Sequence, residues 1–306
     1  MASAWLRLLA VVVRTCGRDS AMVKGTTMSV QIVQTPSGPM EYEVDGSGPA
    51  VLVLKGGHCT RATRLGHERL ASAGFTVVMP SRPGYDATPA SVGRTAQAAA
   101  DALAGLLGQL GIATTAVIGI SAAGPTALAL ALRHPQLVSH VVLESAVSLP
   151  WDAATQRMAA IPFGRLERLT WGLLHAGLRR WPLPVMRMML GGLTTLDAGD
   201  VLARMGPEER AFVHGMIASM RSGRGFMCDV RHRVDGLGGL VCPVLAMYTP
   251  HDGSVPPAHA QRVAREAPRA TLYEVQADTH LIWAGPQSQA VWARRLAFLR
   301  GEAWPG

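Results

Sequence analysis

Three residues of the kinds that cooperate in nucleophilic catalysis lie in separate segments of the chain, in the order serine, aspartate, histidine. Ser121 follows the run AVIGI, Asp252 stands in YTPHDGSVPP, and His280 stands in ADTHLIW. A serine hydroxyl is a weak nucleophile unless a base takes its proton, and that base needs a third group to orient it. These residue types predict attack by Ser121, provided that the fold brings the three together.

The surroundings of Ser121 favour a sharp turn between a strand and a helix. Serine weakens the interior of a helix, because its hydroxyl competes for backbone hydrogen bonds. Pro125 fits a first helical turn, where an N–H has no acceptor within the helix. Four small residues would let strand and helix approach closely: Gly119, Ala122, Ala123 and Gly124. The alternative is that Ser121 only caps the helix, the commonest role of serine in that position.

Alternating strand and helix patterns predict the frame that positions these residues. Two short alternating runs around a Pro-Ser-Gly-Pro turn, within residues 30–46, indicate a β-hairpin. Further strands are expected within residues 50–57, 74–85, 114–120, 137–146, 242–250 and 270–276. Helices are expected near residues 64–73, 92–110, 257–267 and 286–300, and directly after Ser121. The alternation predicts an α/β fold with a doubly wound, mostly parallel sheet, in which the loops after the strands meet at one edge.

The middle of the chain departs from this alternation. Residues 151–235 hold no clear strand pattern, and prolines divide them into short helical pieces rich in tryptophan and methionine. Such side chains form either a helical core or a lid over an apolar pocket, because methionine adapts to irregular shapes. We therefore expect an α/β core (residues 28–150 and 236–306) with a helical lid (151–235) inserted after the sixth strand. Residues 1–27 are expected to be an N-terminal extension, disordered or weakly helical.

Composition and charge exclude several other classes of protein. Hydrophobic residues make up 48% of the chain and charged residues 16%, as is typical of a globular protein with a large core. The net charge of +8 comes from scattered arginines without a nucleic-acid-binding motif, so no nucleic-acid partner is expected. The apolar run at residues 8–13 is too short to cross a bilayer, which takes about 20 residues. We expect a cytoplasmic protein without stable membrane insertion and leave its oligomeric state open.

Four sequence motifs resemble the α/β-hydrolase superfamily, and the resemblance covers residues 29–306. LKGGHCT is similar to the family's H-G-G or H-G-x oxyanion turn, with Lys55 where histidine is common. PSRPGY resembles its D-R-P-G-Y-G loop, HPQLVSHVVLESA its strand after the nucleophile helix, and ADTHLIW its G-x-H-L segment. The family's G-x-S-x-G elbow is altered, because Ala123 replaces its last glycine and Gly124 comes one position later. Esterases and proline iminopeptidase-like enzymes are the members that the chain is most similar to.

The resemblance implies a role for each residue of the site. Ser121 would be the nucleophile, His280 the general base and then acid, and Asp252 the group that orients the histidine. The backbone N–H groups of Gly57 and Ala122 would form the oxyanion hole. Serine at the elbow argues against the haloalkane dehalogenase and epoxide hydrolase branches, which use aspartate there. Neither a metal nor a cofactor is expected, and the partner would be a small-molecule acyl substrate.

Other residues near these motifs allow alternative roles. Glu144, at the end of an expected strand, is the rival to Asp252 as the orienting acid. His58 could line the pocket or supply the second oxyanion N–H in place of Gly57, although a partly exposed loop residue is the simpler interpretation. Cys59 has no base segment arranged for it and is interpreted as a small buried residue.

These observations predict a serine hydrolase that cleaves carboxylic esters through an acyl-enzyme on Ser121. Cleavage of amides or of carbon-carbon bonds would use the same three residues. A non-catalytic ligand-binding protein on the same fold is the alternative of a different class, because a fold alone does not fix function.

Overall fold

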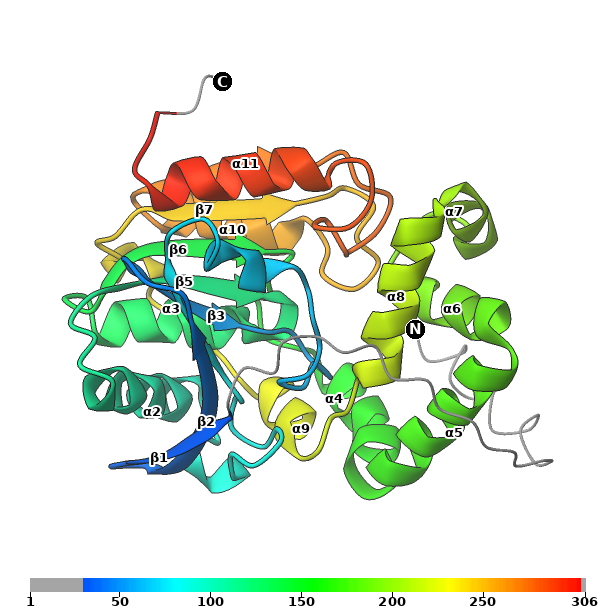
Figure 1. The fold of residues 1–306 in the computed structure, drawn as a ribbon, viewed down its shortest axis with the longest axis horizontal. Helices are drawn as coiled ribbons and strands as arrows, with labels where there is room; N and C mark the ends of the chain where they lie inside the picture. The colour runs from blue at the N-terminus through cyan, green and yellow to red at the C-terminus, as the bar shows by residue number, and fades with distance from the viewer. Residues whose placement is uncertain (1–29, 304–306) are drawn as a thin grey trace.

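The computed structural model describes residues 30–303, and its centre is an eight-stranded sheet (Figure 1). In chain order the strands are β1 (Gln31–Thr35), β2 (Gly38–Asp45), β3 (Ala50–Leu54), β4 (Thr76–Pro80), β5 (Thr115–Ile120), β6 (Val138–Glu144), β7 (Val244–Tyr248) and β8 (Ala270–Glu274). Their order across the sheet is β1-β2-β4-β3-β5-β6-β7-β8. Only the β1–β2 and β2–β4 pairs are antiparallel. The carboxyl ends of β5, β7 and β8, which precede the three candidate residues, therefore lie along one edge.

Helices cover both faces of the sheet. One face packs against α2 (Ala96–Gln109), α3 (Gly124–Arg133) and α10 (Ala258–Glu266), and the other against α11 (Ser288–Leu299). Within β3, Leu52 and Leu54 belong to the hydrophobic cluster on the face covered by α2, α3 and α10, whereas Val51 and Val53 belong to the cluster on the face covered by α11. Because both faces of this strand are buried, its sequence is a continuous apolar run rather than an alternating one.

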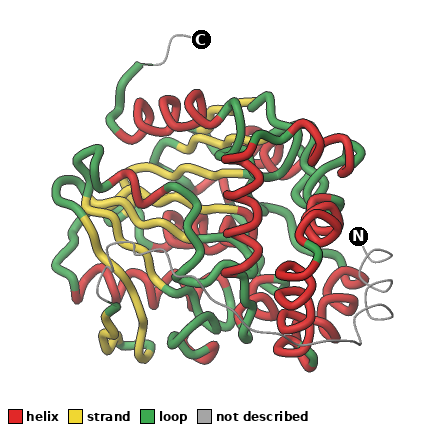
Figure 2. The backbone as a smooth tube through the Cα atoms, turned by 45° about the vertical axis from the view of Figure 1, so that its right-hand side comes forward, coloured by secondary structure: helices red, strands yellow, loops and turns green. Residues whose placement is uncertain are grey.

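Residues 151–235, called the helical segment below, follow β6 and contain helices but none of the sheet strands. These helices are α4 (Ala153–Ala160), α5 (Glu167–Arg180), α6 (Pro182–Leu190), α7 (Ala198–Arg204), α8 (Pro207–Ser219) and α9 (Gly225–Asp229). A π-helical turn, Ile161–Arg165, joins α4 to α5. Figures 1 and 2 show the helical segment beside the sheet rather than on either of its faces. Its buried Trp171 and Ile217 belong to the same hydrophobic cluster as Ile118 of β5.

The predicted strands and hairpin are confirmed, whereas the helix expected near residues 64–73 is wrong. That stretch forms only a 3-10 turn, η1 (His67–Leu70), followed by further turns. Gly66 and Gly74 both have positive φ, +87° and +90°, and so interrupt the chain at both ends of the stretch. The few residues between them are too short a run for a stable α-helix.

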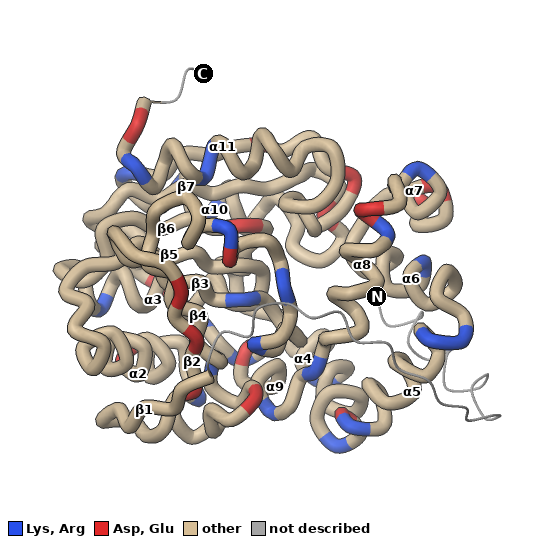
Figure 3. Tube along the Cα trace, in the orientation of Figure 1, with Lys and Arg blue, Asp and Glu red and all other residues tan. Residues whose placement is uncertain are grey.

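The predictions for residues 1–27 lie outside the part of the chain that the structure describes, residues 30–303. Within that part, no helix combines the length and the apolar character needed to cross a membrane. Figure 3 shows positions of basic residues along both the sheet and the helical segment, with positions of acidic residues among them. The positive charge is thus spread over the molecule, as the scattered arginines of the sequence predict.

Candidate active site

Ser121 lies at the turn between β5 and α3, in a backbone conformation that is rare for a residue with a side chain. Its φ is +52°, in the left-handed region. Ser121–Ala123 form one 3-10 turn, η3, before α3 begins. The Ser121 carbonyl accepts the N–H of Val147 at 2.9 Å, which ties the turn to the chain after β6. Strained backbone of this kind costs about 1–3 kcal/mol and is concentrated at functional sites.

Close packing around this turn requires glycine at two positions. A Cβ at Gly119 would lie 2.7 Å from the Cβ of Ala127, and a Cβ at Gly124 would lie 2.1 Å from the carbonyl oxygen of Val147. Ala123, which replaces the last glycine of the elbow pattern, is fully buried and has a φ of −82°. The turn therefore accommodates alanine at position 123 and needs glycine at position 124.

The alternative interpretation of Ser121 as a helix cap is wrong. Ala123 occupies the N-cap position of α3, and no side chain in the described part of the chain caps either α3 or the 3-10 turn before it. The serine is instead half-buried, at the point where the turn meets the glycines that follow β3. A structural explanation based on capping does not account for serine in this place.

Asp252 and His280 are in direct contact, although 28 positions separate them in the chain. His280 Nδ1 lies 2.7 Å from Asp252 Oδ2. The other carboxylate oxygen, Oδ1, accepts the N–H groups of Ser254 at 2.8 Å and Val255 at 2.7 Å. Because an ionised carboxylate can only accept, the proton of the imidazole belongs on Nδ1 and the lone pair on Nε2. That is the tautomer that a general base needs.

The helical segment holds the loops that carry this pair. The His280 N–H donates to the Leu193 carbonyl at 2.7 Å, and the Thr195 N–H donates to the His251 carbonyl at 3.0 Å. A Cβ at Gly253 would lie 2.5 Å from the carbonyl oxygen of Thr194, so the two stretches approach closely. The chain just after α6 is therefore part of the support of the candidate site, which the sequence did not indicate.

Ser121 stands at the same edge of the sheet as the Asp252–His280 pair. Within residues 30–303, no hydrogen bond joins the Ser121 hydroxyl to His280. Hydrogen bonds between catalytic groups are often long in enzymes without substrate and shorten in the complex. The structure thus brings Asp252 and His280 into contact and places Ser121 in a different loop at the same edge of the sheet.

The turn after β3, residues 55–59, is called the glycine turn below. It lies directly against the serine turn, η3. A Cβ at Gly56 would lie 3.0 Å from the Cβ of Ser121, and a Cβ at Gly57 would lie 3.4 Å from the Cβ of Ala122. The Gly57 N–H has no protein acceptor in the part of the chain that the structure describes. The two backbone groups predicted to form an oxyanion hole, at positions 57 and 122, therefore belong to adjacent turns.

His58 is held between the glycine turn and the helical segment. Its ring centroid lies 3.9 Å from that of Phe226 and 4.3 Å from that of Phe163. Its Nδ1 lies 2.7 Å from Ser222 Oγ. Its backbone N–H donates to the Tyr85 hydroxyl at 3.3 Å, so this N–H already has an acceptor. Burial lowers the pKa of the imidazole to about 3, which keeps the ring neutral.

Glu144, the rival acid, is committed to other partners. Its Oε1 accepts Arg295 Nε at 2.6 Å and its Oε2 lies 2.8 Å from His67 Nε2. Burial alone would raise the pKa of this carboxyl, but the adjacent Arg295 and His67 outweigh burial and lower the pKa to about 2. The geometry therefore gives His280 to Asp252 and leaves Glu144 in a buried ion cluster.

Lys55 and Cys59, the first and last residues of the glycine turn, are not arranged for catalysis. Lys55, which stands where the family has histidine, donates to the Arg61 carbonyl at 2.6 Å, and burial lowers its pKa to about 8. Burial raises the pKa of the Cys59 thiol to about 11, so its reactive thiolate form is disfavoured near neutral pH. The Cys59 side chain is half-buried, rather than fully buried as expected, and packs against the hydrophobic cluster that contains Ile118.

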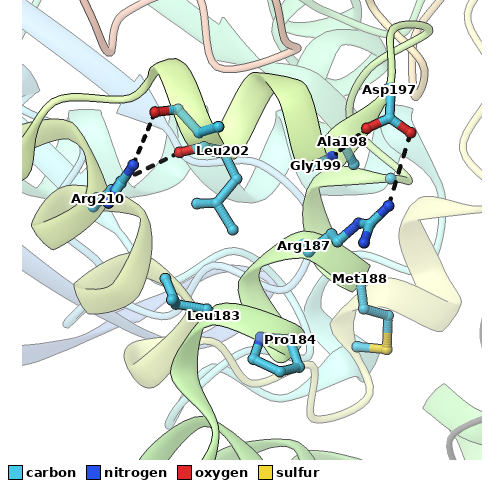
Figure 4. A pocket seen from close by; sticks show the side chains of 11 residues that line it. Leu183, Pro184, Arg187, Met188, Asp197, Ala198, Gly199, Leu202 and Arg210 are labelled. Carbon is cyan, nitrogen blue, oxygen red and sulfur yellow. Dashed lines mark hydrogen bonds and ion pairs between the residues drawn. The ribbon is translucent and has the colours of Figure 1, made fainter.

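A groove of about 980 Å³ lies elsewhere, within the helical segment. Figure 4 shows Leu183, Pro184 and Met188 of α6 facing Leu202 of α7, with Arg210 of α8 nearby. None of the candidate catalytic residues lines this groove. It is therefore a separate surface feature and does not define where a substrate would meet Ser121.

Sequence reasoning missed one buried group beside the glycine turn. Arg82, in the PSRPGY loop, forms an ion pair with Asp229 of α9, 147 positions later in the chain. No spacing rule in the sequence could have connected these two residues, since the pairing depends on how the helical segment docks on the sheet.

The strand order, the strained serine turn and the Asp-His pair after the last two strands are features of the α/β-hydrolase fold. Residues 66–181 match the family of the alpha/beta hydrolase fold. The chain has the α/β-hydrolase fold.

Individual proteins are similar to the chain over most of its length. It is 29% identical over 280 residues to the uncharacterized hydrolase YcgS of Bacillus subtilis (strain 168), which covers 88% of this chain and 98% of that protein. An alpha/beta hydrolase fold protein from Nakamurella multipartita has a TM-score of 0.75 and 28% identity, over 89% of this chain and 98% of its own. A thermophilic esterase from Thermogutta terrifontis has a TM-score of 0.67 at 22% identity, over 90% and 100% respectively, which shows a shared fold. The comparisons support a hydrolase.

Proposed function

We propose that the protein is a serine hydrolase that cleaves small carboxylic esters through an acyl-enzyme on Ser121. The observation that carries this proposal is the left-handed backbone of Ser121, beside the glycine turn after β3 and at the sheet edge of the Asp252–His280 pair. A strained serine without a capping role is difficult to explain by folding alone. The similarity to a hydrolase over most of the chain supports the same reaction class.

The reaction would take place in two half-reactions. Ser121 Oγ attacks the ester carbonyl carbon while His280 Nε2 takes the hydroxyl proton, and Asp252 stabilises the imidazolium that forms. The N–H groups of Gly57 and Ala122 bind the resulting oxyanion. Its collapse breaks the bond to the alcohol, which leaves with the proton from His280. A water molecule, deprotonated by His280, then attacks the acyl-enzyme and releases the carboxylic acid.

The hydrogen bonds support Gly57 over His58 as the second oxyanion donor, beside Ala122. The His58 N–H already donates to Tyr85, whereas the Gly57 N–H lies on the turn that faces Ser121 and Ala122. An oxyanion-hole donor contributes roughly 3 kcal/mol to such reactions. We further propose that the helical segment acts as the lid of this site, because Phe226 of α9 packs on the glycine turn itself: a Cβ at Gly57 would lie 3.0 Å from its ring.

Hydrolysis of p-nitrophenyl esters from acetate to laurate tests the proposal. Ser121→Ala should lower the rate by about 10⁴-fold or more, because the nucleophile is lost. Ser145→Ala is the matched control: Ser145 also follows a strand and also has positive φ, +45°, and its buried hydroxyl has no hydrogen-bond partner among residues 30–303. This control should keep the wild-type rate.

Two results would contradict the proposal. Hydrolysis that survives in Ser121→Ala would exclude this serine as the nucleophile. A folded wild-type protein that hydrolyses no ester would exclude a simple esterase and favour amide cleavage, carbon-carbon bond cleavage or a ligand-binding role.

A further inference from the structure

A compact buried cluster fixes the peptide groups on both sides of Gly57. Arg82 Nη2 donates to the Gly56 carbonyl at 2.9 Å, and the Tyr85 hydroxyl accepts the His58 N–H at 3.3 Å. Both side chains converge on Asp229 of α9. Arg82 binds both carboxylate oxygens of Asp229, with Nη2 2.9 Å from Oδ2, and the Tyr85 hydroxyl donates to Oδ2 at 2.6 Å.

Arg82 thereby controls the direction of the Gly57 N–H. The Gly56 carbonyl and the Gly57 N–H belong to one peptide group, and no cis peptide bond occurs in the described chain. In a planar trans peptide the two groups point in opposite directions. When the guanidinium holds the carbonyl on one side, the N–H is held toward the other. Charge-assisted donation to the carbonyl also polarises the N–H of the same group.

Glycine makes this control necessary. Gly57 has no Cβ, so its backbone would otherwise sample more conformations than any other residue, and a freely rotating N–H is a poor oxyanion donor. The Gly56 carbonyl has one further donor, the Cys59 N–H at 3.4 Å within the same turn. That bond closes the turn locally, whereas Arg82 connects it to a rigid group outside the turn.

The anion that balances Arg82 comes from the helical segment. Side chains of Arg82 and Asp229 are 3% and 1% exposed, so each depends on the other for compensation of its buried charge. The backbone here is tightly docked: the N–H groups of Arg224 and Gly225 both donate to the Gly84 carbonyl at 3.0 Å. A Cβ at Gly225 would lie 2.0 Å from the Tyr85 ring. The position of α9 is thus coupled to the position of the glycine turn.

We propose that Arg82, Tyr85 and Asp229 are positioning residues that aim the Gly57 N–H at the reacting oxygen. Through Asp229 they make this oxyanion donor dependent on the docking of the helical segment. The proposal rests on the hydrolase function proposed above, in which Gly57 is a donor. None of the three side chains needs to contact the substrate.

The test compares a ligand that carries an oxyanion with one that does not. A trifluoromethyl ketone adds Ser121 to its carbonyl and places an oxyanion in the hole, whereas the alcohol of the same skeleton only occupies the pocket. Arg82→Lys keeps the charge but cannot span both Asp229 oxygens and the Gly56 carbonyl. Tyr85→Phe removes only the hydroxyl and leaves the ion pair intact. The exposed pair of Arg133 and Asp101 supplies the matched control, Arg133→Lys.

Both site variants should lose about 10- to 100-fold in kcat and in affinity for the ketone, because the oxyanion donor is displaced rather than deleted. KM and the inhibition constant of the alcohol should stay within about twofold of wild type, and Arg133→Lys should not differ from wild type in any of these quantities. Circular dichroism and the melting temperature identify a variant that does not fold. If Arg82→Lys does not fold, Tyr85→Phe, which leaves the ion pair intact, carries the test.

Two outcomes overturn the proposal while leaving the hydrolase function intact. In one, the ketone and the alcohol weaken equally, which indicates a general structural role. In the other, folded Arg82→Lys and Tyr85→Phe bind the ketone like wild type. If wild-type protein neither hydrolyses esters nor forms an adduct with the ketone, the proposed function itself fails, and the positioning role fails with it.

Discussion

At the scale of single residues, Glu144 illustrates how the partners of a buried carboxylate can outweigh the effect of burial on its pKa. It is fully buried between Arg295 and His67, which lower the pKa of the carboxyl to about 2 against the raising effect of burial. In unfolded protein the pKa of glutamate is about 4.3. Because the folded value is the lower one, the charged carboxylate stabilises the fold above about pH 4.3, and this contribution is lost as the pH falls toward 2.

Glu144→Gln should therefore lower the unfolding free energy at pH 7 by about 3–5 kcal/mol, since Arg295 would stay buried without its anion. The variant should also lose part of the decline in stability between about pH 4.3 and pH 2, as measured by urea denaturation across that range. Asp101→Asn, in an exposed ion pair with Arg133, is the control and should change stability little. If the unfolding free energy of Glu144→Gln declined between about pH 4.3 and pH 2 as steeply as that of wild type, Glu144 would not contribute to the pH dependence of stability.

Residue types and local order could be predicted at this scale, but long-range partners could not. Ser121, Asp252 and His280 were found because each follows an apolar run that ends in a loop, a signal local to each segment. The assignment of Asp252 rather than Glu144 to His280 needed the structure, since both acids follow neighbouring strands. No local sequence pattern indicates the Arg82–Asp229 pair, because the two residues meet only when the helical segment packs against the sheet.

At the scale of elements, the junction of β5 and α3 depends on Gly124. A Cβ there would lie 2.1 Å from the Val147 carbonyl oxygen, so Gly124→Ala forces the helix away from the chain after β6. We expect lower thermal stability and a loss of esterase activity of at least about tenfold, because Ser121 shifts with the turn.

Gly172→Ala provides the control for this substitution. Gly172 lies within α5, and apart from its chain neighbours and the nearby backbone of its own helix, no heavy atom of the described residues lies within 4 Å of a Cβ placed there. Alanine favours helices over glycine by up to about 1 kcal/mol, so this variant should be as active as wild type and slightly more stable. Equal behaviour of the two variants in melting and activity assays would contradict the proposed importance of the elbow.

The strands could be predicted better than the short connecting elements. Buried parallel strands such as β3 and β5 are indicated by continuous apolar runs in the sequence. The hairpin of β1 and β2 is indicated by its turn residues. The stretch at 64–73 looked helical because its composition is helix-compatible. Its boundaries are set by two positive-φ glycines, whose conformation depends on how the neighbouring chain packs.

At the scale of the whole molecule, the sheet and the helical segment share one hydrophobic cluster. Ile118 and Met247 of the sheet belong to it together with Trp171 and Ile217 of the helical segment. The Arg82–Asp229 pair and the hydrogen bond from His280 to Leu193 add polar ties between the same two parts. We therefore expect the two parts to unfold together in a single transition, with equal calorimetric and van't Hoff enthalpies.

Differential scanning calorimetry with wild type and Tyr85→Phe checks this expectation. The single transition should move to lower temperature in the variant without splitting. Two separate transitions in wild-type protein would show that the helical segment is an independent unit, and its coupling to the glycine turn would then lose its basis.

The most direct test of the central claim is chemical labelling of Ser121 in folded wild-type protein. A fluorophosphonate modifies a serine only when a base and an oxyanion hole activate it. Ser121 is the only serine in the tryptic peptide of residues 95–133, so mass spectrometry can assign the label without ambiguity. The account predicts one label per molecule on this peptide and none in Ser121→Ala. A wild-type peptide that stays unlabelled, or a label carried elsewhere on the chain, would contradict it.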